Sequence, residues 1–171
     1  MTAYIALLRA VNVGGTGRLE MSELKAMCKA EGFGSIATYI ASGNVVFTAQ
    51  GTEAEVKAAL EARLKAYAGK TVGVVVRTAK AMAQVLTDNP FPDAKASFTV
   101  AIFLDAKPAA DALEGIRHKA EDEEVVLGER EIYVSYGSGM GRSRLVIPAA
   151  KDGTARNMNT IAKLVEMAGA I

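Results

Sequence analysis

The sequence predicts an α+β protein made of two ferredoxin-like halves, each a split βαβ motif, packed together. Short apolar runs rich in β-branched residues alternate with stretches whose apolar residues recur at helical spacing. The predicted order of elements in the first half is strand, helix, strand, strand, helix, strand. A proline-containing break at 89–92 separates it from a second half of looser but similar order. We expect one half at 1–77, a helix and bridge at 78–96, and a second half with the C-terminal helix at 97–171.

The first half opens with an uninterrupted apolar run at 4–8, which is typical of a buried strand. A helix follows and stops at Gly32, because glycine readily adopts the conformation that ends helices. Strands at 36–40 and 45–48 are joined through Ser42-Gly43, which predicts a tight hairpin. The inner face of the helix is expected to comprise Met21, Leu24, Met27 and Cys28.

A second helix begins at a capping box, with Thr52 as the N-cap and Glu55 reaching back to it. Gly69 ends this helix, and a strand at 72–76 completes the motif. The apolar spacing assigns the inner face of the helix to Val56, Ala59, Leu60, Leu64 and Tyr67.

Thr78 is expected to cap a further helix, which ends at the proline-containing break. A strand at 98–104 begins the second half. Pro108 suits the first position of a helix, because its missing N–H has no partner there in any case. That helix would direct Leu113 and Ile116 inward.

The remaining chain predicts a hairpin of strands at 124–127 and 131–136 around Gly128, and a short strand or an extended piece at 145–147. A final helix closes the second half. Its inner face is expected to comprise Ile161, Leu164, Val165 and Ala168.

Composition excludes several classes of protein. The formal net charge of the 171 residues is +1, so there is no general attraction to nucleic acid or anionic membranes. Cys28 is the only cysteine, which rules out an internal disulfide and a thiolate metal cluster. No apolar run reaches about 18 residues, and the N-terminus has no signal-peptide pattern. We therefore expect a cytoplasmic protein with no membrane association.

Four polar segments rich in glycine and asparagine interrupt this apolar chain, at 9–18, 42–44, 137–143 and 154–160. Each lies at the edge of a predicted strand or helix, where backbone donors and side-chain amides converge on ligands. The first follows a strand and precedes a helix, as phosphate-binding loops do, but it matches neither a Walker A nor a dinucleotide fingerprint. The candidate ligand-binding residues are Arg9, Asn12, Gly14, Gly15, Ser42, Gly43, Asn44, Arg142, Ser143, Arg156, Asn157, Asn159 and Thr160.

Each segment also has a purely structural interpretation. In that interpretation the first and third are flexible connections rich in glycine, and Thr154 or Asn157 only caps the last helix. Arg9 could form an ion pair with Glu20 or Glu23 instead of facing a cleft. His118 is expected in solvent, and Cys28 in the core.

The chain resembles a bacterial family known as domain of unknown function 1697. Residues 7–15, Leu-Leu-Arg-Ala-Val-Asn-Val-Gly-Gly, are similar to its signature Leu-Leu-Arg-Gly-Ile-Asn-Val-Gly-Gly. Residues 39–47, 89–91, 136–143 and 154–160 match further motifs of the family in the same order. The resemblance implies two ferredoxin-like halves and no particular activity. Ala10 replaces the usual glycine, and Met158 stands where the family usually has tryptophan.

We expect the polar segments to form one cleft that binds a small phosphate- or carboxylate-bearing ligand. The sequence leaves open whether the protein is an enzyme, because no catalytic triad, metal-ligand spacing or carboxylate pair is present. No cofactor or metal is expected. One alternative is nucleic-acid binding through a sheet face and the arginine-bearing loops, with Tyr133 and Phe103 as stacking residues. The other is a structural homodimer formed through edge strands.

Overall fold

The computed structural model describes residues 1–12 and 18–171. The chain forms two compact units, each described by itself below. Unit 1 comprises Met1–Ala83 and Lys163–Ile171, and unit 2 comprises Gln84–Ala162. The predicted ranges kept the whole C-terminal helix in the second half. The structure instead assigns the end of that helix to unit 1, because the contacts of Lys163–Ile171 are with unit 1.

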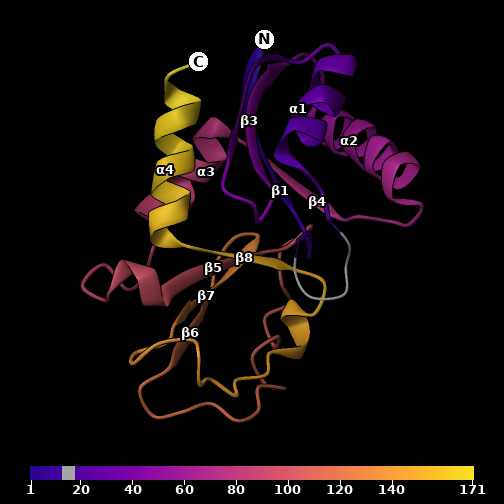
Figure 1. Ribbon diagram of the computed structural model, residues 1–171. Helices are drawn as coiled ribbons and strands as arrows, with labels where there is room; N and C mark the ends of the chain where they lie inside the picture. The colour runs from indigo at the N-terminus through magenta and orange to yellow at the C-terminus, as the bar shows by residue number, and fades with distance from the viewer. Residues whose placement is uncertain (13–17) are drawn as a thin grey trace. The chain divides into compact units, whose positions relative to one another are not determined.

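Unit 1 contains a four-stranded antiparallel sheet with the order β2-β3-β1-β4, which is the split βαβ arrangement expected for this half. Helices α1 and α2 lie together on one side of the sheet, and α3 and the end of α4 lie on the other (Figure 1). The elements are β1 (Thr2–Leu8), α1 (Met21–Ala30), β2 (Gly34–Tyr39), β3 (Asn44–Ala49), α2 (Glu53–Ala68), β4 (Val74–Thr78) and α3 (Ala79–Thr87).

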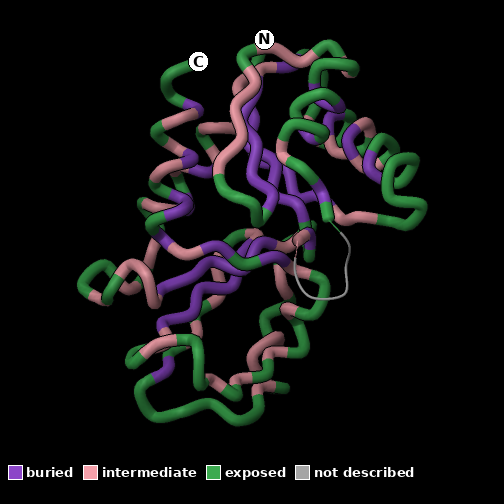
Figure 2. The backbone as a smooth tube through the Cα atoms, in the orientation of Figure 1, coloured by how far each residue is buried: buried purple, intermediate pink, exposed green. Residues whose placement is uncertain are grey.

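Strand β1 is buried on both faces, as its uninterrupted apolar run predicts. Side chains alternate along a strand, so Tyr4, Ala6 and Leu8 face the core beneath α1 and α2. Ile5 and Leu7 point to the opposite face and are also fully buried. The buried strands at the centre of unit 1 are visible in Figure 2.

Local signals set the ends of the helices. Thr52 and Glu55 form both bonds of the capping box, and Gly69 ends α2 with a φ of 71°. Thr78 Oγ1 accepts a hydrogen bond from the Ala81 N–H at 3.1 Å, so the predicted cap of α3 is confirmed.

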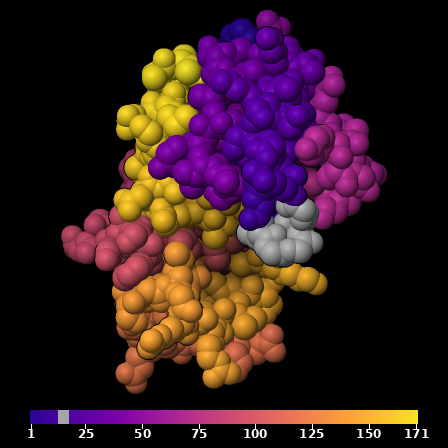
Figure 3. All heavy atoms as spheres, in the orientation of Figure 1, coloured from indigo at the N-terminus to yellow at the C-terminus, as the bar shows by residue number. Residues whose placement is uncertain are grey.

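The prediction that Tyr67 lies on the inner face of α2 is wrong. Tyr67 is 48 % exposed, whereas Leu64, one turn earlier in α2, is buried. Helix α2 forms an outer flank of unit 1 (Figure 3), so the ring of Tyr67 faces solvent at the end of that helix.

Unit 2 has a four-stranded antiparallel sheet with the order β6-β7-β5-β8, which repeats the strand order of unit 1. Val100, Ile102, Ile132 and Val134 form the core on one face. The elements of this part of the chain are the 3-10 helix η1 (Ala96–Phe98), β5 (Thr99–Phe103), β6 (Glu124–Leu127), β7 (Glu131–Ser135), the 3-10 helix η2 (Pro148–Ala150), β8 (Thr154–Asn157) and α4 (Met158–Gly169).

The helix predicted from Pro108 is not formed. The segment makes consecutive turns, in which Ala112, Glu114 and Ile116 each donate to the carbonyl three residues earlier. A run this short, ending at Gly115, gains too few hydrogen bonds to offset the cost of starting an α-helix. Leu113 nevertheless packs against the core of unit 2.

The piece at 145–147, predicted as a short strand or an extended piece, forms a single antiparallel bridge between Val146 and Arg117. One smaller prediction in unit 2 changes. The segment at 154–160 does not open the last helix as a whole. Its first part is the edge strand β8, which pairs with β5, and α4 starts at Met158.

Candidate anion-binding pocket

Strand β1 ends at a point where two loops of unit 1 meet. Strands β1 and β4 are antiparallel neighbours, with Leu8 opposite Val74. The end of β1 therefore lies beside the start of β4, and the loop after β1 lies beside the loop that joins α2 to β4. The Leu8 N–H donates to the Gly43 carbonyl at 2.8 Å and the Arg9 N–H donates to the Gly73 carbonyl at 2.9 Å. These bonds fix the position from which Arg9 leaves the sheet.

The backbone just after Arg9 is strained. Ala10 and Asn12 have φ values of 52° and 54°, in the left-handed region. Asparagine tolerates this conformation, whereas alanine there costs roughly 1–2 kcal/mol. Glycine would adopt this conformation without that cost.

Asn12 holds the loop after β1 in place. Its Nδ2 donates to the carbonyl oxygens of Leu19 and Ala41, both at 2.8 Å, and its Oδ1 accepts from the Leu19 N–H at 2.7 Å. Three bonds to backbone groups occupy the amide, so Asn12 supports the loop and is not a primary ligand contact.

The segment at 42–44 also has a structural role. Asn44 is fully buried, and its Nδ2 donates to the Tyr39 carbonyl at 2.9 Å and to Ser42 Oγ at 3.0 Å. Gly43 has a φ of 89°, and a Cβ there would lie 2.7 Å from the side chain of Val11. The motif therefore builds the tip of the β2–β3 hairpin and supports the end of β1 from one side.

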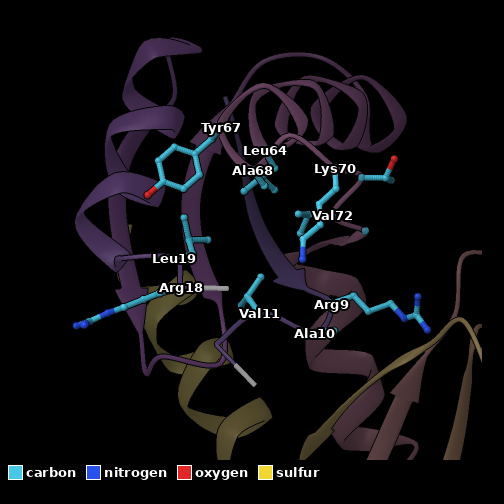
Figure 4. Close-up of a pocket in the computed structure, with 12 residues that line it drawn as sticks. Arg9, Ala10, Val11, Arg18, Leu19, Leu64, Tyr67, Ala68, Lys70 and Val72 are labelled. Carbon is cyan, nitrogen blue, oxygen red and sulfur yellow. The ribbon is translucent and has the colours of Figure 1, made fainter. Parts of the chain in front are cut away.

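A hollow of about 730 Å³ opens between the two loops and the last turn of α2. The β1–α1 loop supplies one wall, the end of α2 the second, and the α2–β4 loop the third (Figure 4). The lining residues are Arg9, Ala10, Val11, Arg18, Leu19, Leu64, Tyr67, Ala68, Lys70, Thr71, Val72 and Gly73, all in unit 1. We call this hollow the β1–α2 pocket.

Three cationic side chains line the β1–α2 pocket, namely Arg9, Arg18 and Lys70. In Figure 4 the ammonium of Lys70 points toward the middle of the hollow, while the guanidinium groups of Arg9 and Arg18 extend toward opposite sides. Arg18 pairs with Glu20 at 2.8 Å, and 81 % of its side chain is exposed. Exposed side chains of this length change rotamer within nanoseconds, so Arg18 can turn toward a bound anion.

The remaining wall of the pocket is apolar. Leu19 and Leu64 are buried, Val72 is half-buried, and the ring of Tyr67 is exposed beside them. The sequence analysis did not anticipate Lys70, Arg18 or Tyr67 as site residues. The split βαβ topology itself could have indicated Lys70, because it brings the α2–β4 loop to the end of β1.

Comparison with known proteins now adds to this geometry. Residues 1–133, which include the whole lining of the pocket, match the family model described as "Protein of unknown function (DUF1697)". The chain belongs to the DUF1697 family. No curated protein matches it. The chain is also similar to "The structure of conserved bacterial protein SP0830 from Streptococcus pneumoniae", with a TM-score of 0.79 and 23% identity over 98% of both chains. This similarity shows the fold and supplies no activity.

The polar segments at 137–143 and 154–160 lie in unit 2, where two of their residues have clear structural partners. Asn157 Oδ1 accepts from the Thr160 N–H at 2.9 Å and so caps α4. Ser143 Oγ donates to the carboxylate of the buried Glu123 at 2.5 Å. This bond holds the loop that contains Ser143 against the segment at 120–123. Arg142 and Asn159 are exposed.

Arg156 is buried on edge strand β8. It donates to Thr154 Oγ1 at 2.7 Å and to the Ala155 carbonyl at 2.9 Å. Burial disfavours its charged form and lowers the pKa of the guanidinium to about 10. Convergence of the unit 2 candidates with Arg9 remains a prediction, and Gly14 and Gly15 lie outside the described residues.

The structure also shows where the single cysteine and the single histidine of the chain lie. Cys28 is buried in the core, and burial raises the pKa of its thiol to about 12. His118 is exposed, as expected. Across residues 1–12 and 18–171, acidic, histidine and cysteine side chains form no cluster able to hold a metal ion. No helix in the same residues is long and apolar enough to cross a membrane.

The nucleic-acid alternative loses its two stacking residues, while binding through the arginine-bearing loops stays a prediction. Phe103 is fully buried and Tyr133 is 2 % exposed, so neither ring can stack on a base. The Tyr133 hydroxyl donates to the Val85 carbonyl at 3.0 Å, which fixes it in the interior. The homodimer alternative stays a prediction.

Proposed function

We propose that this protein binds a small anion, bearing a phosphate or carboxylate group, in the β1–α2 pocket. The observation that carries the proposal is the placement of Arg9, Arg18 and Lys70 around one hollow whose described lining contains no aspartate or glutamate. Glu20 lies just outside the lining and pairs with Arg18. A cluster of cationic side chains around one hollow attracts anions.

Lys70 is the central contact in this proposal. Its ammonium points into the hollow from the loop that follows α2 (Figure 4). An ion pair at an exposed site contributes about 0.2–1 kcal/mol, so one lysine alone would bind an anion weakly. Inward rotation of Arg18 adds planar donors that suit phosphate and carboxylate oxygens.

The same residues favour binding without catalysis. The titratable side chains that line the pocket in the described part of the chain are arginine, lysine and tyrosine. General acid–base catalysis near neutral pH usually depends on histidine or a carboxylate within hydrogen-bond reach of the substrate. A function in recognition or transport of the anion fits this set better than bond cleavage.

Titration of the protein with inorganic phosphate by nuclear magnetic resonance tests the proposal. We expect amide shifts centred on residues 9–11 and 70–73, and an affinity about two- to fivefold lower in Lys70→Ala. Lys25→Ala removes the same charge from an exposed position on α1 and serves as the control. Identical titration curves for the parent and Lys70→Ala, or shifts confined to other surfaces, would remove the proposal.

A further inference from the structure

The apolar wall of the β1–α2 pocket indicates that the ligand is larger than an isolated anion. Leu64 and Tyr67 come from the last turn of α2, and Leu19 and Val72 from the two loops. The hollow of about 730 Å³ falls within the range of small-molecule sites and is far larger than a phosphate ion. An ion alone would leave the exposed ring of Tyr67 and the half-buried Val72 in contact with water.

The direction of α2 adds polarity to the pocket. Its final residues, including Tyr67 and Ala68, present the C-terminal end of the helix dipole, which carries partial negative charge. An anionic group is therefore disfavoured against this turn, whereas an apolar group is not. Lys70 directly follows the C-cap Gly69, so its ammonium offsets the negative end of the dipole, and Arg9 lies across the hollow on the end of β1. Negative charge is therefore favoured at the Lys70 ammonium and not at the carbonyl groups of the last turn.

We propose, on the basis of the proposed function, that the ligand is an anion attached to a compact apolar body, such as an aromatic or short acyl group. The charged group lies against Lys70, whose ammonium points into the hollow. The apolar body lies against Val72 and the ring of Tyr67. Tyr67 is then a specificity-determining residue. Its ring is exposed at the end of α2 in the protein without ligand, and the apolar body of the ligand covers it on binding.

The test compares ligands that differ only in the apolar body. Calorimetric titration with inorganic phosphate and phenyl phosphate gives one pair, and acetate with benzoate and hexanoate gives a second series. We expect phenyl phosphate to bind about tenfold more tightly than phosphate, because its ring removes apolar surface from water. The relative affinities of benzoate and hexanoate distinguish an aromatic body from an acyl body.

Variants separate the two parts of the ligand. Tyr67→Ala is expected to weaken phenyl phosphate about three- to tenfold and to leave inorganic phosphate unchanged. Tyr67→Phe keeps the ring and should bind as the parent does. Lys70→Ala should weaken both ligands. Tyr67 is largely exposed, so thermal unfolding of its variants should match that of the parent.

The outcomes distinguish this inference from the proposed function. Equal affinities for phosphate and phenyl phosphate, with both dependent on Lys70, would overturn the apolar-body inference and leave anion binding intact. Binding of neutral benzyl alcohol as tight as that of phenyl phosphate would overturn anion binding itself. A parent protein that binds none of these ligands would overturn both.

Discussion

The side-chain amide of Asn12 donates to the carbonyl oxygen of Ala41 at 2.8 Å, although the two residues are 29 positions apart in the chain. This bond joins the loop after β1 to the tip of the β2–β3 hairpin. The same amide exchanges two further bonds with Leu19, so one side chain holds both ends of the loop that borders the pocket. The asparagine of the family signature is thus explained by loop architecture.

Asn12→Ala should destabilise unit 1. The change removes three hydrogen bonds and leaves partly buried backbone groups without their partner, which costs about 1–3 kcal/mol. Urea unfolding measures the difference from the parent. Asn159→Ala, at an exposed asparagine of α4, is the control and should change the free energy of unfolding by less than about 0.5 kcal/mol. Equal stability of the two variants would contradict the loop-holding role.

Ala10→Gly should stabilise the protein slightly. Glycine relieves the left-handed strain at φ 52°, and this gain exceeds its greater entropy in the unfolded chain, for a net of about 0.5 kcal/mol. Ala58→Gly is the matched control, because Ala58 is exposed in the interior of α2, where glycine costs about 1 kcal/mol. Thermal unfolding of the two variants should therefore shift in opposite directions. A shift in the same direction would show that Ala10 is not strained.

Gly43→Ala and Gly69→Ala separate backbone strain from steric clash. Both glycines have positive φ, at 89° and 71°, so alanine is strained at either position by roughly 1–2 kcal/mol. A Cβ at Gly43 would also lie 2.7 Å from Val11 Cγ2 and 2.9 Å from Leu8 Cβ, whereas nothing lies within 4 Å of one at Gly69. Gly43→Ala should thus be the more destabilising by about 1–3 kcal/mol in urea unfolding. Similar values for the two would mean that the hairpin tip adapts without cost.

Cys28 should make stability fall with rising pH in the alkaline range. Burial raises the pKa of its thiol from an ordinary value near 9 to about 12, so the folded protein keeps a proton that the unfolded chain releases. The contribution is complete below pH 9 and is lost as pH rises toward 12. Urea unfolding between pH 8 and about 10.5 should show a steeper decline for the parent than for Cys28→Ala.

A second measurement on Cys28 uses its chemistry. Alkylation requires the thiolate, so iodoacetamide should react with the native protein at pH 8.5 far more slowly than with the urea-unfolded chain. Comparable rates in the two states would show that the thiol is accessible and ionised, contrary to its position in the core.

The parts of the fold that depend on neighbouring residues could be predicted from the sequence. The capping box at Thr52 and the hairpin at Gly43 are set by residues within a few positions of one another, and both are confirmed. The topology of unit 1 followed from its strand and helix order. Pro108 is typical of a helix start, but the segment that follows it is too short to form a helix, so the prediction of a helix there was wrong.

The candidate site was harder to predict, because strand pairing in the sheet brings its residues together from distant parts of the sequence. Arg9 was identified from a charge at the end of an apolar strand, and it does line the β1–α2 pocket. Asn12 and Asn44 were identified from their polarity, but their amides are occupied by backbone partners. Lys70 and Tyr67 carry no local signal. They enter the site only because β4 pairs with β1.

Unit 1 is discontinuous in the chain, because it consists of Met1–Ala83 and Lys163–Ile171. During synthesis on the ribosome, its second segment emerges last, after all of unit 2. Nascent unit 1 must therefore persist as an incomplete intermediate while the following 79 residues, Gln84–Ala162, are translated, at about 5–20 residues per second. A chain shortened at its C-terminus would remain in that incomplete state and would expose apolar surface to chaperones and proteases.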